Sequence, residues 1–293
     1  MTEPSRRVGF IGLGRMGAAI AGRLLDAGYD VTVWSRSAGK ADDLAARGAN
    51  VGETPEDAIA AGTVFSMLSD ENAVRQVFTA ERLRSAPEGF VHVNHATISP
   101  EAAREFAAQG GRYLSAPVVG RPEAVVAGKL TVLVSGDAEA RAEASPMLAA
   151  IGRQVWEFGD AVDAAPTAKI SVNYLIIHAL QALSESITVL EHAGLDTGRF
   201  VDMINDSVFP GTVYRGYGDA IANSAYAPPG FTAALGLKDL KLALDTAGEL
   251  GVDLPAGPVL QDVFATAVEQ VGADLDWASI AEVTRRRSGG EPR

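Results

Sequence analysis

Three glycines at fixed spacing, in the segment Gly12-Leu13-Gly14-Arg15-Met16-Gly17, constrain the fold more than any other feature of this sequence. The segment follows an apolar run at residues 8–12 and opens a stretch of helical composition. In that setting Gly12 permits a tight turn, Gly14 leaves space against the backbone, and Gly17 lets helix and strand pack closely. The start of such a helix offers free N–H groups and a partial positive charge to a diphosphate. A glycine-rich turn without a ligand is the alternative.

The first half of the chain repeats this strand-and-helix alternation. From residue 8 to about residue 158, β-branched or aromatic runs alternate with alanine-rich stretches, which is the pattern of a parallel sheet with crossover helices. We expect strands at residues 8–12, 30–34, 64–68, 90–94, 113–116, 131–135 and 154–157.

After Pro166 the patterns are helical only. The first is a long apolar helix at about residues 167–193, which we expect to be buried nearly all round because polar positions are sparse on its circumference. Later helices are expected at residues 197–206, 214–223, 232–250, 255–271 and 277–284, before a frayed charged tail at 285–293. The sequence thus predicts an α/β Rossmann domain (residues 1–165) followed by an all-α domain (residues 166–293), joined by a long interdomain helix.

The end of the second expected strand favours a particular dinucleotide. An NAD-specific site places an acidic residue on the adenosine ribose about 18 residues after Gly17, but Ser35-Arg36-Ser37 stands there. Arg36 can pair with a 2′-phosphate, the two serines can donate hydrogen bonds to it, and Lys40 follows closely. The pattern favours NADPH/NADP over NADH, while an arginine that is merely exposed is the alternative.

Two further strand ends are expected to line the same crevice, because ligands of open α/β sheets bind beyond the carboxyl ends of the strands. One carries Met67, Leu68 and Ser69, of which the first two can cover the cofactor. The other carries Thr97, which we place near the nicotinamide ribose. Taken singly, each residue is equally consistent with ordinary packing or turn chemistry.

Composition excludes several classes of function. A formal net charge of −12 argues against a surface that binds nucleic acid. Cysteine is absent, which excludes thiol chemistry, and the four histidines are too scattered to suggest a metal site. The polar start of the chain lacks the features of a signal peptide, and polar residues interrupt the longest apolar stretch, so we expect a cytoplasmic protein without a membrane span.

A candidate catalytic pair lies on the long helix. Lys169 and Asn173 are four residues apart and therefore project from one face. A buried ammonium beside a carbonyl could give its proton to the developing alkoxide while NADPH delivers hydride to the carbon. His178 is an alternative acid, although its apolar neighbours favour a structural role.

Another candidate cation follows in a later helix. Lys238, near Asp239 and Lys241, could approach the nicotinamide or its ribose. A solvated charged face is the alternative for these three residues.

With these motifs the chain resembles the β-hydroxyacid dehydrogenase family, which includes 3-hydroxyisobutyrate dehydrogenases and reductases of tartronate semialdehyde and glyoxylate. The likeness covers almost the whole chain and rests on five segments: residues 8–17, Ala116-Pro117-Val118, residues 128–130, residues 169–173, and Phe231 with residues 237–239. The resemblance implies a Rossmann domain, a connecting helix and a helical domain, with Lys169 catalytic and Asn173 its partner. It also implies a small carbonyl acid as substrate and a homodimer or tetramer.

One family motif is altered in a way that bears on the substrate. The Ser-Gly-Gly that holds the substrate carboxylate in the family reads Val119-Gly120-Arg121 here. Val119 cannot donate a hydrogen bond, whereas Arg121 can bind a carboxylate through two N–H groups, or can belong to a surface turn paired with Glu123.

The altered motif is also consistent with a second enzymatic hypothesis. The chain is also similar to imine reductases, which share the fold and the NADPH preference but have an aspartate or tyrosine in place of the lysine. The apolar Val119 suits a hydrophobic cyclic imine, and several aromatic residues are available for a hydrophobic pocket: Tyr174, Phe209, Tyr214, Tyr217 and Trp277. A non-catalytic NADPH-binding sensor is a third hypothesis.

Overall fold

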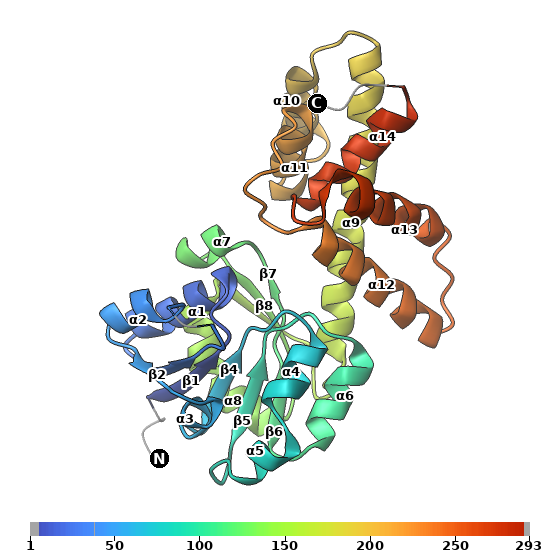
Figure 1. Ribbon diagram of the computed structural model, residues 1–293. Helices are drawn as coiled ribbons and strands as arrows, with labels where there is room; N and C mark the ends of the chain where they lie inside the picture. The colour runs from blue at the N-terminus through green and yellow to red at the C-terminus, as the bar shows by residue number, and fades with distance from the viewer. Residues whose placement is uncertain (1–5, 38, 290–293) are drawn as a thin grey trace. The chain divides into compact units, whose positions relative to one another are not determined.

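The computed structural model describes residues 6–37 and 39–289, and the chain divides into two compact units between Lys169 and Ile170. The first unit contains a twisted sheet with helices (Figure 1), and the second is helical. The predicted succession of a Rossmann domain, a long helix and a helical domain is confirmed. Among the described residues, no helix is both long and apolar enough to cross a membrane.

The sheet of the first unit has the strand order β3-β2-β1-β4-β5-β6-β8-β7, with β9 paired to β8. Strands β1 to β6 are parallel to their neighbours, β8 runs antiparallel to β6 and β7, and β9 is parallel to β8. The strands are β1 Arg7–Ile11, β2 Asp30–Trp34, β3 Asn50–Val51, β4 Thr63–Ser66, β5 Val91–Asn94, β6 Arg112–Ser115, β7 Val118–Val119, β8 Thr131–Gly136 and β9 Gln154–Glu157. Each of the seven expected strands overlaps one of these, whereas the two-residue strands β3 and β7 were not predicted.

The helices that connect these strands begin where short polar side chains bind free backbone N–H groups. Asp70, Thr79, Ser99 and Asp137 accept such bonds at the starts of α4, α5, α6 and α8. The helices are α1 Arg15–Asp26, α2 Asp42–Ala46, α3 Pro55–Ile59, α4 Glu71–Val77, α5 Ala80–Arg84, α6 Pro100–Ala108, α7 Pro122–Val126 and α8 Ala138–Ile151.

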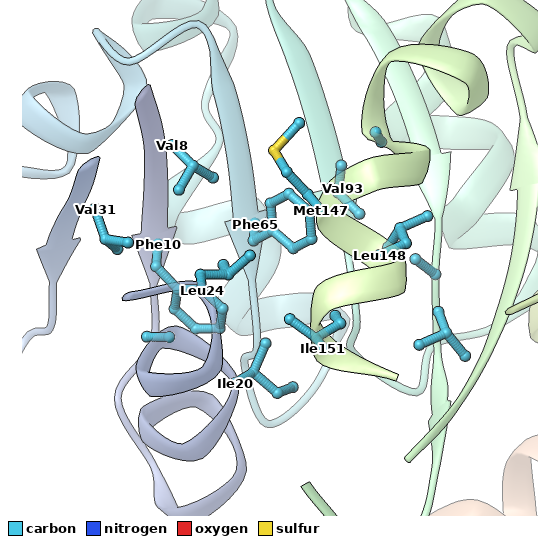
Figure 2. Packing of buried hydrophobic residues seen from close by; sticks show 14 of the residues in the cluster. Val8, Phe10, Ile20, Leu24, Val31, Phe65, Val93, Met147, Leu148 and Ile151 are labelled. Atoms are coloured by element: carbon cyan, nitrogen blue, oxygen red, sulfur yellow. The ribbon is translucent and has the colours of Figure 1, made fainter. Parts of the chain in front are cut away.

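Side chains of the strands alternate between two hydrophobic cores, as the period of two requires. Phe10 and Phe65 pack with α1 and α8 in one core, where Ile20 and Met147 meet them (Figure 2). The next residue of β1, Ile11, belongs to the other core, with residues of α3, α4 and α6. Because helices cover both faces, we expect a ligand of this sheet to bind beyond the carboxyl ends of its strands.

In the second unit, helices α10 to α14 gather around the later part of α9 (Figure 1). Their core includes Leu180, Phe264 and Trp277. The elements are α9 Ala164–His192, α10 Thr197–Ser207, α11 Thr212–Ala222, α12 Ala233–Glu249, α13 Gly257–Thr266, a π-helical turn η1 Ala267–Gly272, a short 3₁₀ helix η2 Trp277–Ile280 and α14 Ala281–Arg287.

Two expectations about this unit are wrong. Helix α9 is not buried nearly all round, because Leu175 and Val189 on one face are 69% and 68% exposed. The chain is also not frayed from Arg285 onward, because α14 continues to Arg287. Arg285 is buried and donates hydrogen bonds to Glu191 and Tyr226. The expected tail residues 290–293 lie outside the described residues.

Candidate functional site

The carboxyl ends of five parallel strands lie in one row. The pairing register places Ile11 opposite both Trp34 and Ser66, Ser66 opposite Asn94, and Asn94 opposite Ser115. The segments that leave this row are the glycine-rich turn, residues 35–37, residues 67–69, residues 95–97 and residues 116–119. The sheet therefore brings together, at the carboxyl ends of its strands, the candidate cofactor and substrate segments, which are far apart along the chain.

The glycine-rich turn has the geometry that its spacing predicts. Gly12 has φ +97°, and a Cβ there would lie 2.4 Å from the carbonyl oxygen of Met67. A Cβ on Gly17 would lie 1.9 Å from the carbonyl oxygen of Gly12. No atom lies within 4 Å of the corresponding position on Gly14, so only this glycine faces open space. Gly12 and Gly17 serve the turn itself, and Gly14 leaves room for a ligand.

Helix α1 begins at Arg15; its N-cap residue, Gly14, offers no side-chain cap, and the first turn has no acidic residue. The N–H groups of Arg15, Met16 and Gly17 thus lie at a positive helix end that an anion would stabilise. The exposed side chain of Arg15 is paired with Glu123 at 3.3 Å. This helix start fits a dinucleotide diphosphate.

The segment after β2 presents the residues expected at the adenosine end. Ser35 is partly buried, and Arg36, Ser37 and Lys40 are exposed. Lys40 lies in a turn before α2, because that helix begins only at Asp42. The placement leaves the guanidinium of Arg36 accessible to a phosphate.

The end of β4 lies next to the glycine-rich turn, and the end of β5 lies next to that of β4. Met67 donates its backbone N–H to the carbonyl of Ile11 at 2.9 Å, and the Leu68 side chain approaches Gly12. Ser69 is exposed and donates to Asp70, whereas Thr97 is partly buried after β5.

The altered substrate motif runs from β7 into α7. Val119 is the last residue of β7, Gly120 has φ +144°, and Arg121 immediately precedes α7. Helix α7 packs against α1, and the Arg15 pair with Glu123 joins the two. The carboxylate of Glu123 is therefore engaged with Arg15 of the glycine-rich turn.

The candidate catalytic residues lie on α9 and are both buried. Lys169 is 8% exposed and Asn173 is 3% exposed. Their four-residue spacing places them one turn apart on the same helix face. An ammonium shielded from water next to a carboxamide is a suitable arrangement for proton transfer to a bound oxygen.

Within the second unit, Asn173 is held by a residue whose role the sequence did not identify. Its Nδ2 donates to Oδ2 of Asp239 at 2.5 Å, and Lys238 Nζ lies 3.0 Å from Oδ1 of the same carboxylate. Asp239 is 1% exposed, so the alternative of a solvated charged face is wrong for this residue. Lys238 and Asn173, predicted separately, share this carboxylate.

His178 lies one turn beyond Tyr174 on α9, and the two rings meet edge to face with centroids 4.5 Å apart. This contact agrees with a structural histidine. Sequence reasoning also missed a buried polar set on β4, β5 and β6 and directly after β5, whose members are Ser66, His92, Asn94, His95 and Tyr113. The polar residues within the expected strand at residues 90–94 were the feature of the sequence that could have indicated this set.

The two halves of the chain match two families. Residues 7–159 match the family described as the NAD binding domain of 6-phosphogluconate dehydrogenase. Residues 163–284 match the family described as NAD-binding of NADP-dependent 3-hydroxyisobutyrate dehydrogenase. The chain belongs to the β-hydroxyacid dehydrogenase family. It is an NAD(P)-dependent oxidoreductase of this type, which confirms the resemblance stated from the motifs.

Several known proteins of this family are similar to the chain over nearly its whole length. The uncharacterized oxidoreductase YfjR of Bacillus subtilis is 37% identical over 94% of this chain and 98% of its own. Glyoxylate/succinic semialdehyde reductase 1 of Arabidopsis thaliana is 29% identical over 95% of this chain and 98% of its own.

Solved structures include both enzyme classes considered from the sequence. The 3-hydroxyisobutyrate dehydrogenase of Mycobacterium tuberculosis has a TM-score of 0.84 at 29% identity, covering 95% of this chain and 98% of that one. A reductive aminase from Aspergillus terreus, in complex with NADPH and ethyl levulinate, has a TM-score of 0.62 at 25% identity. The match covers 95% of this chain and 99% of that one.

Proposed function

We propose that this β-hydroxyacid dehydrogenase uses NADPH to reduce a small aldehyde or keto acid of the semialdehyde type, with Lys169 as general acid. The observation that carries the proposal is the buried Lys169 one helical turn from Asn173, whose amide is held by Asp239. The glyoxylate/succinic semialdehyde reductase among the similar proteins supports this class of substrate.

Each group in the site would have a defined task. Gly14 and the start of α1 would hold the diphosphate, and Arg36 with Ser35, Ser37 and Lys40 would bind the 2′-phosphate. Met67, Leu68, Ser69 and Thr97 would line the nicotinamide end. The bound cofactor supplies a hydride to the carbonyl carbon. Lys169 gives its proton to the carbonyl oxygen, which yields an alcohol and a neutral amine that takes a proton back from water.

Asn173 would fix the orientation of the reacting groups. Because Nδ2 donates to Asp239, the Oδ1 of the same amide is directed away from that carboxylate as an acceptor. Such an acceptor can hold an ammonium or a substrate hydroxyl.

The role of Lys169 is tested by Lys169→Ala, with the exposed Lys241→Ala as the matched control. We expect K169A to bind NADPH normally, measured by cofactor fluorescence, but to lose turnover on small semialdehydes. A kcat within about tenfold of the wild-type value would leave only ~1.4 kcal/mol for the lysine and would refute its role as the acid.

The preference for NADPH is supported by the exposed Arg36 after β2, where an NAD-specific site has an acid. Arg36→Ala should raise the Kd for NADPH by tenfold or more, equivalent to ~1.4 kcal/mol, and leave the Kd for NADH nearly unchanged. NADH serves as the internal control, since it differs only by the missing phosphate. Equal losses for both cofactors would contradict the assignment.

A second candidate function, imine reduction, is favoured by Val119 in place of the carboxylate-binding serine and by the similar reductive aminase. Under the leading proposal Val119, Gly120 and Arg121 contact the substrate, and Arg121 binds its carboxylate. Arg121→Gln should then raise KM for semialdehyde acids without affecting hydrophobic cyclic imines. Faster turnover of cyclic imines than of any acid on the same panel would favour imine reduction.

We further propose that the enzyme is a homodimer or tetramer. The exposed leucine and valine on α9, Leu175 and Val189, support an apolar contact with a second copy. Sedimentation of the wild-type protein and of Leu175→Glu tests this, because a charge in such a contact should release monomers.

A further inference from the structure

The parallel ladder between β5 and β6 ends at two side-chain hydrogen bonds. The strands pair as far as Asn94 and Ser115, and the N–H of Ala116 still donates to the carbonyl of Asn94 at 2.7 Å. In a continuing parallel ladder the next bond would run from the N–H of Ala96 to the carbonyl of Ala116. That bond is replaced by two bonds to side chains.

Asn94 and His95 supply the replacements. The N–H of Ala96 donates to Oδ1 of Asn94 at 3.0 Å, and the carbonyl of Ala116 accepts from Nδ1 of His95 at 2.5 Å. Both backbone groups thus stay paired although the strands part, which avoids the cost of burying them without partners. The side chains end the ladder and hold the two departing segments at the same time.

His95 performs this task at a cost to stability. A carbonyl oxygen can only accept, so Nδ1 carries the proton, and burial lowers the pKa of this histidine to about 4, which keeps the ring neutral. Its Nε2 is buried and has no hydrogen-bond partner within residues 6–37 and 39–289. The cost of burying this acceptor offsets part of the stability gained from the bond to Ala116, and the ring packs against Phe65.

The segments that His95 joins are the ones that line the candidate site. His95 itself leads into Ala96 and Thr97, on the side assigned to the nicotinamide. Ala116 leads through Pro117 into Val119 and the altered substrate motif. A displacement of Ala116 would therefore also move Val119 and Arg121, which contact the substrate in the proposed function.

We propose that His95 is a positioning residue that sets the spacing between the nicotinamide side of the site and the substrate loop at residues 116–121. The inference rests on the proposed function, because it takes Val119 to Arg121 as the substrate-binding segment. His95 acts through the carbonyl of Ala116 and need not touch the substrate.

The test compares His95→Leu with His92→Leu, a matched control three residues earlier, on β5. His92 is also buried, but its Nε2 pairs with the side chain of Ser66 at 2.8 Å and its ring stacks on Phe78, so it binds neither departing segment. His95→Asn is the conservative variant, because its amide places an N–H donor near the position of Nδ1.

Two readouts are measured on the full-length protein: hydrogen exchange of peptides covering residues 116–121, and steady-state kinetics on the semialdehyde and imine panel. We expect H95L to speed exchange in this segment and to lower kcat/KM by roughly tenfold or more, with the Kd for NADPH changed less than about threefold. H92L should lower the melting temperature without either effect, and H95N should restore most of the kcat/KM.

The outcomes separate this inference from the proposed function. If the wild-type protein reduces no compound on the panel, the proposed function fails, while the exchange of residues 116–121 still decides the role of His95. If H95L and H92L have the same loop exchange and the same kcat/KM, His95 has only a structural role and the inference is wrong.

Discussion

Asn173 on α9 donates its side-chain amide to the buried carboxylate of Asp239 on α12, with Nδ2 and Oδ2 2.5 Å apart. The bond determines the orientation of the amide, because an N–H group directed at Asp239 turns Oδ1, an acceptor, away from that carboxylate. A residue beside the candidate acid is thereby oriented by one 66 positions later in the sequence.

Replacing Asp239 should therefore impair catalysis more than cofactor binding. Asp239→Ala removes the acceptor and lets the Asn173 amide rotate, so we expect kcat/KM to fall by about 100-fold, the usual scale for a displaced catalytic group. Asp239→Asn retains an acceptor, so its kcat/KM should fall less. The exposed Asp245 on the same helix provides the control, Asp245→Ala. Equal kinetics for D239A and D245A would show that Asp239 does not orient the site.

The glycines of the cofactor turn predict opposite results for two similar substitutions. Gly14→Ala adds a methyl group to open space at φ −70°, so the free enzyme should be unchanged or up to ~1 kcal/mol more stable. NADPH affinity should fall by tenfold or more, about 1.4 kcal/mol, because the methyl group occupies room for the diphosphate.

Gly17→Ala should instead destabilise the protein without cofactor, because its Cβ would lie 1.9 Å from the carbonyl oxygen of Gly12. Overpacking of this kind costs about 1–3 kcal/mol. Thermal unfolding with and without NADPH measures both effects. An undiminished NADPH affinity in G14A would mean that the cofactor does not approach this turn.

Much of the fold was predictable because its signals are local. The spacing of Gly12, Gly14 and Gly17 states a backbone geometry directly, and the period-two pattern locates the long strands without knowledge of their partners. Strand ends could be assigned to one crevice because parallel strands with helical crossovers all point the same way. The two-residue strands β3 and β7 escaped prediction since so short a segment carries no periodicity.

The features that were missed depend on residues far apart in the sequence. Asp239 looks like any charged residue of an amphipathic helix, and only the packing of α12 near Asn173 shows that it is buried. Arg285 looks like part of a basic tail until Glu191, 94 positions earlier, is placed beside it. The strand end at Asn94 and His95 requires the register of β6 before its replaced bonds can be recognised.

Two buried histidines, His92 on β5 and His95 just after it, should make the protein less stable in mild acid. Burial lowers the pKa of His92 to about 3 and that of His95 to about 4, from an ordinary value of 6.5. The unfolded chain therefore binds more protons than the native protein between pH 6.5 and 4, so stability is full above pH 6.5 and falls as the pH is lowered.

Each pKa unit is worth about 1.4 kcal/mol, so the two histidines together should account for several kcal/mol. Urea unfolding at pH 7, 6 and 5 measures the loss. H92L should show a shallower fall than the wild-type protein, since it lacks one of the two groups. An identical slope in the variant would show that His92 does not remain neutral in the native state.

The last helix should prove essential to the stability of the second unit. Arg285 on α14 is 3% exposed, lies 2.6 Å from Glu191 Oε1, and donates to Tyr226 and to the carbonyl of Ile221 at 2.9 Å. Arg285→Met keeps the bulk of the side chain but leaves the carboxylates of Glu191 and Glu282 without their cation. Breaking a buried set of this kind costs about 3–5 kcal/mol.

Arg287→Met is the matched control, because Arg287 is exposed and pairs with Asp262 at the surface, where such pairs contribute at most about 1 kcal/mol. Urea unfolding followed by circular dichroism compares the two variants. Adding Glu282→Leu to R285M should recover part of the loss, since it removes one of the two stranded carboxylates. If R285M were no less stable than R287M, α14 would be a dispensable end of the chain, as its charged sequence alone suggests.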